Sequence, residues 1–151
     1  MKSIAEDAMA RAIETSILIA APASRVWSVL MDFGGYPAWN PFIRTIEGER
    51  RIGARLEVQI EAPGLKAQTF RPVVVEVEPE RIFSWRGSLP MPGLFTGHHR
   101  FVLSAESSGT RFEHSEQFSG LLIPFVGSVL DATERGFRAM NEALKAKSEA
   151  R

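Results

Sequence analysis

Apolar and polar residues alternate along the middle of this chain, between residues 42 and 119, which is the pattern of strands that bury one face. The alternation is clear in residues 56–60 and 97–106, and in residues 73–77 three valines at every second position are expected to share a face. An earlier stretch, residues 13–19, places three isoleucines on one face. We therefore expect a first strand over residues 13–19, followed by about six antiparallel strands.

The spacing of apolar residues changes from two to 3.6 after Gly120, which predicts a long amphipathic C-terminal helix. Its apolar stripe consists of Val126, Val129, Leu130, Thr133, Phe137, Met140 and Leu144. Gly136 beside the stripe permits a close approach between helix and sheet. A shorter helix is expected over residues 22–31 and a helical turn within residues 34–41, where Asn40 would turn the chain. The long helix must bury its stripe, and the concave face of the sheet is the partner available.

Composition narrows the class of protein. A chain of 151 residues is long enough for one domain with a real core, and we expect it over residues 13–147, preceded by a partly helical extension over residues 1–12. The 18 basic side chains balance 18 acidic ones, which argues against a nucleic-acid partner. Acidic residues near the N-terminus argue against a signal peptide, and no apolar run is long enough for membrane insertion. A soluble cytoplasmic monomer or homodimer is the expectation.

One predicted strand, residues 110–119, carries polar groups on its core side. Its even positions begin and end with Phe112 and Phe118 but hold His114 and Glu116 between them. Burying an imidazole and a carboxylate costs several kcal/mol unless the groups are paired or line a cavity. The strand therefore predicts a pocket with a polar patch inside an otherwise apolar sheet.

Five stretches carry a resemblance to a known superfamily: residues 19–27 (IAAPASRVW), 32–42 (ending YPAWNPF), 78–85 (EPERIFSW), 97–101 (GHHRF) and 110–118 (TRFEHSEQF). With the order of elements, they resemble the SRPBCC superfamily, the helix-grip proteins that include START domains, polyketide cyclase/dehydrase proteins and pollen-allergen-like proteins. The resemblance implies an α+β helix-grip fold, in which a curved antiparallel sheet of about six to seven strands wraps a long C-terminal helix, with two short helices after the first strand. It also implies an apolar cavity between sheet and helix for lipids, polyketides or similar molecules.

The expected lining of that cavity combines aromatic and aliphatic side chains with the polar patch. We predict ligand contacts from Trp39, Phe83, Trp85, Leu94, Phe95, His99, Phe101, Phe112, His114, Glu116, Phe118, Val129 and Phe137. The apolar loop over residues 89–95 is interpreted as one lip of the cavity mouth, because large exposed apolar patches usually mark binding sites. Packing under the long helix, or a dimer contact, would account for the loop equally well, and the aromatic residues could be plain core.

The histidines raise the possibility of a metal site. His98 has the polar parity of its strand and is expected on the surface, whereas His99 is expected to face inward. If residues 108 and 109 form a two-residue turn, His99 faces Phe118 and His114 faces Leu103. The two histidines would then stand roughly 13 Å apart along the ladder, too far to share one ion. We therefore expect neither a metal nor another cofactor.

Glu116 is the better partner for both histidines, because it lies two residues from His114 and diagonal to His99 across the hairpin. Such a pair could position a ligand hydroxyl or carbonyl, or simply shape the cavity as a buried hydrogen-bonded pair. The leading hypothesis is binding of a hydrophobic small molecule. The alternative is an enzyme of the polyketide cyclase/dehydrase type, with His114 and Glu116 as the catalytic acid–base pair and His99 polarising a carbonyl. A protein-interaction module is a third class, which no outward-facing residue indicates.

Overall fold

The computed structural model describes residues 9–89, 91 and 93–150. In this part of the chain the strands are β1 (Ala10–Ile19), β2 (Ile43–Glu47), β3 (Glu57–Ile60), β4 (Gln68–Phe70), β5 (Val73–Glu78), β6 (Ile82–Ser88), β7 (Thr96–Glu106) and β8 (Gly109–Ser119). The helices are α2 (Ala23–Met31), α3 (Tyr36–Trp39) and α4 (Gly127–Glu149), with short 3₁₀ turns η1 (Phe33–Gly35) and η2 (Ile123–Phe125). No helix of the described residues is long and apolar enough to cross a membrane.

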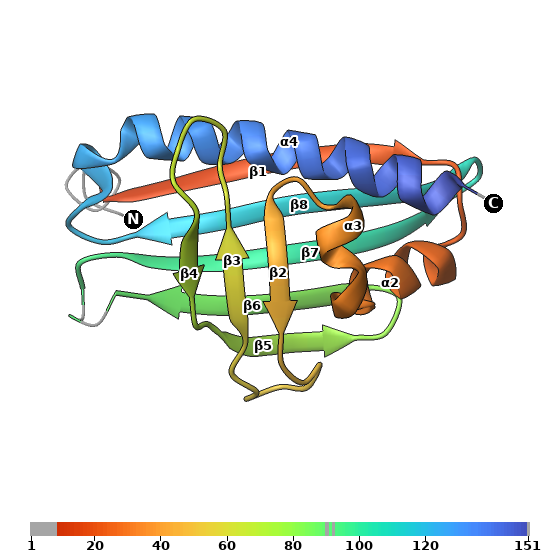
Figure 1. Cartoon of the computed structure of the whole chain (residues 1–151), viewed down its shortest axis with the longest axis horizontal. Coiled ribbons are helices and arrows are strands. Elements are labelled where there is room, and N and C mark those ends of the chain that lie inside the picture. Colours follow the sequence, from red (N-terminus) through yellow and green to blue (C-terminus); the bar gives the residue numbers. More distant parts are fainter. Residues whose placement is uncertain (1–8, 90, 92, 151) are drawn as a thin grey trace, which may run out of the picture.

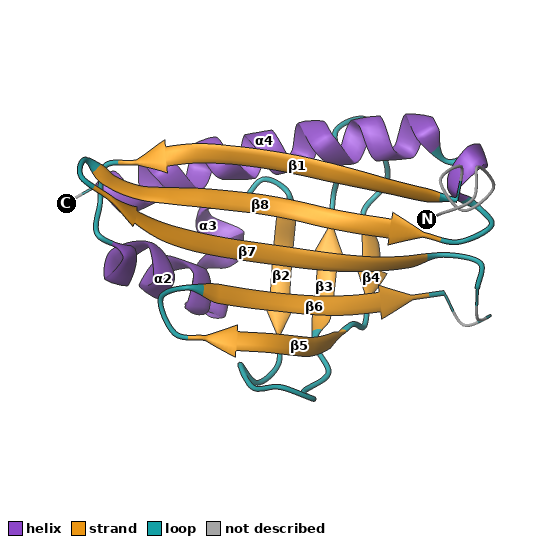
Figure 2. Cartoon of the chain, turned by 180° about the vertical axis from the view of Figure 1, so that it is seen from behind, coloured by secondary structure: helices purple, strands orange, loops and turns teal. Residues whose placement is uncertain are grey.

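The described strands form two antiparallel sheets. The larger has the order β1-β8-β7-β6-β5, and the smaller has the order β2-β3-β4. Figure 1 shows the small sheet crossing one face of the large sheet, while α4 runs along the β1 edge. The view from behind in Figure 2 shows the other face of the large sheet without a covering helix. The α+β helix-grip arrangement and the two short helices after β1 are confirmed, and the single curved sheet of six to seven strands is eight strands in two sheets.

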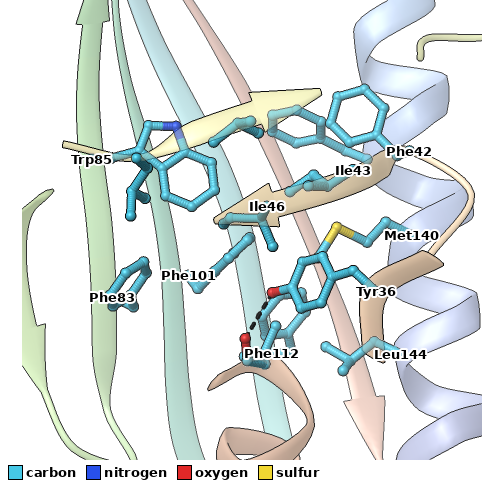
Figure 3. Close-up of a cluster of buried hydrophobic side chains, with 14 of the residues drawn as sticks. Tyr36, Phe42, Ile43, Ile46, Phe83, Trp85, Phe101, Phe112, Met140 and Leu144 are labelled. Carbon is cyan, nitrogen blue, oxygen red and sulfur yellow. Dashed lines mark hydrogen bonds between the residues drawn. The ribbon is translucent and has the colours of Figure 1, made fainter. Parts of the chain in front are cut away.

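The core fills the space between the two sheets and α4. Its largest fully buried side chains include Tyr36, Phe42, Phe83, Phe101 and Phe112, which are labelled in Figure 3, and also Phe137. A Cβ atom at Gly136 of α4 would lie 2.3 Å from the Phe42 ring, so this glycine does permit a close approach. The group that approaches is the Phe42 ring at the start of the small sheet, so α4 is tied to both sheets.

The link from the short helices into β2 is held by side chains that hydrogen-bond to the backbone. Asn40 Oδ1 accepts hydrogen bonds from the backbone N–H groups of Phe42 and Ile43, at 2.9 and 2.8 Å, which confirms its predicted role in turning the chain. The buried Tyr36 hydroxyl donates to the backbone oxygen of Leu30 at 2.8 Å, drawn as the dashed line in Figure 3. These contacts set where the small sheet begins.

Two predicted strand patterns differ in detail. The first strand begins at Ala10, three residues before the predicted start, because Ala10 and Ala12 pair with Ser119 and Gln117 of β8. This pairing over a long sequence distance outweighs a weak local preference for helix. Residues 1–8 of the predicted extension lie outside the described residues.

The prediction that valines 73, 75 and 77 share a face was wrong. A β-bulge lies between Val74 and Glu76, and inserts one residue into the period of two. As a result Val74 is the buried valine of this stretch, opposite Trp85 of β6.

The turn between β7 and β8 decides the geometry of the interior. Glu106 lies opposite Gly109, so Ser107 and Ser108 form the turn, one residue earlier than predicted. Gly109 has a φ of +145°, and a Cβ atom there would lie 2.0 Å from the backbone oxygen of Ile19. Because Gly109 is needed where β8 passes this close to β1, it belongs to the strand, and every facing pair of the hairpin shifts by two residues.

Candidate functional site

A chain of five polar side chains crosses the interior from β1 to β8. Thr15 Oγ1 lies 2.9 Å from Asn141 Nδ2, and Asn141 Oδ1 lies 2.9 Å from His114 Nδ1. His114 Nε2 lies 2.8 Å from His99 Nε2, and His99 Nδ1 lies 3.0 Å from Glu116 Oε1. Four of the five residues are buried, and the Glu116 side chain is 17% exposed. We call this set the polar relay.

The direction of the polar relay follows from one backbone carbonyl. Thr15 Oγ1 donates to the backbone oxygen of His114 at 2.7 Å, and that oxygen can only accept. The Thr15 hydroxyl has one proton, so its oxygen must accept from the Asn141 amide nitrogen. The Asn141 carbonyl therefore faces His114, and His114 Nδ1 must carry a hydrogen and donate it.

The remaining protons are placed by the same logic. A neutral His114 with its hydrogen on Nδ1 accepts at Nε2, so His99 Nε2 donates. Nδ1 of a neutral His99 then accepts, and the proton in this last hydrogen bond belongs to Glu116. Burial raises the pKa of Glu116 to about 8 and lowers the pKa of His99 to about 3. Burial also holds the pKa of His114 well below its ordinary value. All three directions favour neutral side chains.

The two histidines are neighbours, so the predicted separation of roughly 13 Å was wrong. His114 lies opposite Phe101, and His99 lies opposite Glu116, because the turn precedes the predicted one by one residue. The Nε2 atoms touch at 2.8 Å, which removes the register as a reason against a shared metal ion. Within the described ranges no three histidine, aspartate or glutamate side chains group in a way that could hold one.

Aromatic side chains cover the faces of both imidazoles. The His114 ring stacks on Phe137 with centroids 3.9 Å apart and planes 7° apart. The His99 ring stacks on Trp85 at 4.5 Å and 16°. Since both nitrogens of each ring are used inside the polar relay, neither histidine offers an atom to a ligand. Their effect is to hold Glu116, through the hydrogen bond to His99.

Glu116 is the member of the polar relay that reaches the surface. Its Oε1 lies within hydrogen-bond distance of His99, and Oε2 makes no hydrogen bond to a described residue. Oε2 is not among the fully buried polar atoms that lack a partner, so it is accessible from the surface. A Cβ atom at Gly97 would lie 2.2 Å from Oε2, so the absence of a side chain at Gly97 leaves room for this oxygen. Phe118 follows Glu116 on the same face of β8. Glu116 Oε2 is thus the polar atom that a ligand can meet.

The β6–β7 and β8–α4 connections lie at the end of the molecule where α4 begins, on the left of Figure 1. Exposed apolar side chains occur in these two segments and in the β3–β4 hairpin. We call them the apolar rim: Leu65 and Phe70 of the β3–β4 hairpin, Leu89 and Met91 of the β6–β7 loop, Leu121 and Phe125 between β8 and α4, and Val129 in the first turn of α4. Backbone N–H groups of residues 121 and 122 donate to the carbonyls of residues 93 and 94, at 3.0 Å each, so two of these segments are joined. Residues 90 and 92 of the predicted lip lie outside the described residues.

The other predicted lining residues fall into three groups. The buried group is Phe83, Trp85, Phe101, Phe112, Phe118 and Phe137; the half-buried group is Trp39, Leu94 and Phe95; and Val129 is 42% exposed. Phe95 packs on Phe118 at 5.5 Å between ring centroids, beside the apolar rim. Trp85 and Phe137 stack on the two histidines of the polar relay, whereas Trp39 packs against Tyr36 of α3.

Two members of the polar relay, Thr15 and Asn141, were not predicted from the sequence. Thr15 has the parity of Ile13 and Ile17, so a polar residue stood on the buried side of the first strand. Asn141 lies four residues after Phe137, on the apolar stripe of the long helix. Each could have been found as a polar residue at a core position, and only the fold brings the two together.

Two hollows mark the outside of the described part of the fold. One of about 1060 Å³ lies open on the outer face of the large sheet, lined by His98, Arg100, Glu76 and Arg86 among others. Another of about 540 Å³ lies beside the start of α2. Between sheet and helix, Phe42 and Phe137 pack against each other and against His114. Side chains thus fill the middle of the predicted cavity.

No curated protein matches the chain. Among solved structures, the di-domain ARO/CYC BexL from the BE-7585A biosynthetic pathway is similar with a TM-score of 0.77 and 18% identity, over 95% of this chain and 52% of BexL. Zhui aromatase/cyclase from Streptomyces sp. R1128 is similar with a TM-score of 0.75 and 21% identity, over 93% and 94%. Ara h 8.0201 is similar with a TM-score of 0.68 and 16% identity, over 92% and 97%.

The chain spans about half the length of BexL, and the same holds for the second di-domain protein, StfQ, of which it covers 52%. At these identities the similarity shows the fold. A family model covers the chain more completely, over residues 10–149, which includes every described helix and strand. The chain therefore belongs to the polyketide cyclase/dehydrase and lipid transport family.

Proposed function

We propose that the protein binds an apolar small molecule between the apolar rim and the polar relay, with the Glu116 carboxyl group as its polar anchor. The observation that carries the proposal is the position of Glu116: a partly exposed carboxyl group at the surface end of an otherwise buried chain of hydrogen bonds. Ligand sites commonly combine an apolar lining with a few oriented polar groups. The name of the family, polyketide cyclase/dehydrase and lipid transport, agrees with this class of ligand.

Stability alone gives little reason for the polar relay. Burying two imidazoles and a carboxyl group costs free energy that their hydrogen bonds offset, and an apolar replacement of similar shape is often at least as stable. The interior around His114 already consists of aromatic rings that such a replacement would join. An oriented carboxyl group at the edge of this interior is what a ligand would use.

The ligand would enter where half-buried apolar side chains separate Glu116 from solvent. Leu94 and Phe95 are half-buried, and Phe95 lies against the Phe118 ring. Because side chains fill the middle of the space between sheet and helix, binding requires the Phe95 and Phe118 rings to move aside. We therefore expect the ligand to contact Leu94, Phe95, Phe118 and Val129 first, and the deep aromatic residues to remain as core.

Native mass spectrometry of protein purified gently from its own host, followed by a denaturing run, tests the proposal. A mass excess that is lost on denaturation is the expected result. Titration of the emptied protein with the extracted molecule then compares Val129→Lys, in the apolar rim, with Ala139→Lys on the exposed side of the same helix. Only Val129→Lys should weaken binding. Equal affinities in both variants, or no bound molecule from any preparation, would contradict the proposal.

A second candidate function is general acid–base catalysis of the cyclase or dehydrase type. The observation in its favour is that the partly exposed Glu116 carboxyl group holds a proton at about neutral pH. In this role the Glu116 hydrogen leaves its hydrogen bond to His99 and passes to a developing alkoxide oxygen of the ligand, and His99 holds the carboxyl group in place before the transfer. His114 is a positioning residue, because its ring nitrogens are both used by Asn141 and His99.

The two functions separate in the Glu116→Gln variant, incubated with a poly-β-ketone probe. Glutamine keeps the shape and the hydrogen bonds of the neutral acid but has no proton to give. An enzyme would keep its affinity for the probe and lose turnover. Turnover that persists in Glu116→Gln, or a pH–rate profile without an ionisation near the pKa of Glu116, would remove the catalytic hypothesis and leave the binding protein intact.

A further inference from the structure

We propose that the ligand carries a hydrogen-bond donor, an alcohol or phenol hydroxyl on an apolar skeleton, and gives that hydrogen to Glu116 Oε2. The inference rests on the proposed binding function and names its ligand class. It follows from the direction of the polar relay, because this direction decides whether the surface oxygen of Glu116 accepts or donates.

The surface oxygen accepts whichever way the proton lies between Glu116 and His99. With a neutral pair, the hydroxyl of the acid is on Oε1 and points to His99 Nδ1, so Oε2 is the carbonyl oxygen. With the proton moved to His99, Glu116 is a carboxylate and both oxygens accept. In neither arrangement does Oε2 offer a hydrogen. A ketone or carboxylate oxygen of the ligand beside Oε2 would therefore bring two hydrogen-bond acceptors together with no hydrogen between them.

The opposite direction is the real alternative, and the far end of the polar relay excludes it. If His99 donated from Nδ1 to Oε1, a protonated Glu116 would carry its hydrogen on Oε2 and would favour a carbonyl ligand. That arrangement needs the Asn141 amide to turn around, with its oxygen towards Thr15. Thr15 would then have to donate to Asn141, but its one hydrogen is given to the backbone oxygen of His114. A backbone carbonyl on β8 thereby sets the polarity of an oxygen at the surface.

Gly97 completes the arrangement. Its missing side chain leaves the space that Oε2 occupies, 2.2 Å from where a Cβ atom would lie. Since the conflicting atom is the end of a flexible side chain, alanine at this position would turn the carboxyl group away without disturbing the strand. Gly97 is thus a positioning residue for the ligand-facing oxygen.

The test compares probes that differ in one group: 2-naphthol, 2-methoxynaphthalene and 2-naphthoate, with affinities from calorimetry. We expect 2-naphthol to bind about tenfold or more tightly than the methyl ether, because an acceptor left without a partner is costly. 2-Naphthoate should bind more weakly still. Glu116→Gln should keep the preference, since its amide donates to His99 and leaves a carbonyl oxygen outside. Glu116→Leu, of similar size, should bind both neutral probes equally.

Two further variants report on positioning. Gly97→Ala should reduce the preference for the hydroxyl while affinity for the methyl ether is kept. Thr15→Val removes the group that orients Asn141, and should also reduce the preference. Nitrogen chemical shifts of the imidazoles give an independent readout: the wild type should show hydrogen on Nδ1 of His114 and on Nε2 of His99.

The outcomes separate the inference from the function on which it rests. If no probe and no host molecule binds the wild type, the proposed function fails. If the neutral probes bind equally to the wild type, or the preference persists in Glu116→Leu, binding stands and the ligand class is wrong. Imidazole shifts that place hydrogen on His114 Nε2 would reverse the polar relay and also overturn the inference.

Discussion

His98 and His99 are neighbours in β7 but lie on opposite faces of the large sheet, in opposite electrostatic environments. On the outer face, His98 Nε2 lies 3.1 Å from the Ser84 hydroxyl, which donates to Glu76 at 2.7 Å. Arg100 donates to both oxygens of Glu76, at 2.9 and 3.2 Å. On the inner face, His99 belongs to the polar relay. The expected surface position of His98 is confirmed.

The same pair of residue types therefore holds its protons differently on the two faces. Hydrogen bonds from Arg100 and Ser84 lower the pKa of Glu76, so this carboxylate keeps its charge. Burial raises the pKa of Glu116, so this group keeps its proton. The comparison teaches that a histidine–glutamate pair in a sheet is not by itself an acid–base site, because the available cation and the depth of burial decide which form exists.

The largest expected effect comes from removing an inner histidine. His114→Ala deletes a ring that stacks on Phe137 and leaves the inner groups of Asn141 and His99 without partners. We expect a loss of about 3–5 kcal/mol in the free energy of unfolding. His98→Ala is the matched change on the outer face and should cost less than about 1 kcal/mol. Urea denaturation measures both. Equal losses would mean that the inner histidine contributes no more to stability than the outer one.

The second prediction concerns pH. Above pH 6.5, the folded protein keeps on Glu116 a proton that the unfolded chain releases at its ordinary pKa of 4.5. Stability should therefore fall as the pH rises towards about 8, by up to about 1.4 kcal/mol per unit. Below pH 6.5, the unfolded chain takes up protons that His99 and His114 do not accept when folded, so stability should also fall as the pH drops.

Between pH 4.5 and 6.5 the two histidines outweigh the one carboxyl group, and maximum stability is expected near pH 6.5. Thermal unfolding across pH 4–9 measures this profile. Glu116→Gln should remove the alkaline decline, whereas Glu113→Gln, on the outer side of the same strand, should keep it. A wild-type profile that rises steadily from pH 6.5 to 8 would contradict a protonated Glu116.

A smaller effect is expected from the neighbours Thr15 and Ser16 of β1. Thr15→Val removes the hydroxyl that satisfies both Asn141 and the backbone oxygen of His114, and should cost about 1–2 kcal/mol. Ser16→Ala, which is exposed on the other face, should leave stability unchanged. The same urea experiment measures both. If Ser16→Ala lowered stability as much as Thr15→Val, the assignment of the buried and exposed faces of β1 would be wrong.

The smallest effect is expected on the outer face. Arg100→Gln breaks a partly exposed ion pair with Glu76, which is worth about 0–1 kcal/mol and is weakened by salt. Comparing unfolding in 0.05 and 1 M NaCl should show the difference between wild type and variant shrinking. For Glu116→Leu the difference from wild type should be independent of salt, because the inner pair is neutral. A salt-dependent Glu116 effect would indicate a charged pair inside.

Much of the fold could be predicted from local patterns. Period-two alternation indicated the strands of the large sheet and placed His99, His114 and Glu116 on its inner side, and the 3.6 period indicated α4. These patterns depend on which face of each element is apolar, which neighbouring residues reveal. The same signals included Thr15 and Asn141, but a single polar residue on an apolar face does not indicate its partner.

The amino-acid sequence by itself thus determined the elements, the buried face of each and the presence of polar groups on it. Only the tertiary structure decided which of those groups meet. The close approach of Gly109 to Ile19 sets the turn, and a change of one residue in the turn moves each facing pair by two. Packing of α4 then brings Asn141 to His114. Hydrogen bonds act over about 3 Å, so contacts between residues more than a hundred positions apart depend on the register and on the packing of the whole core.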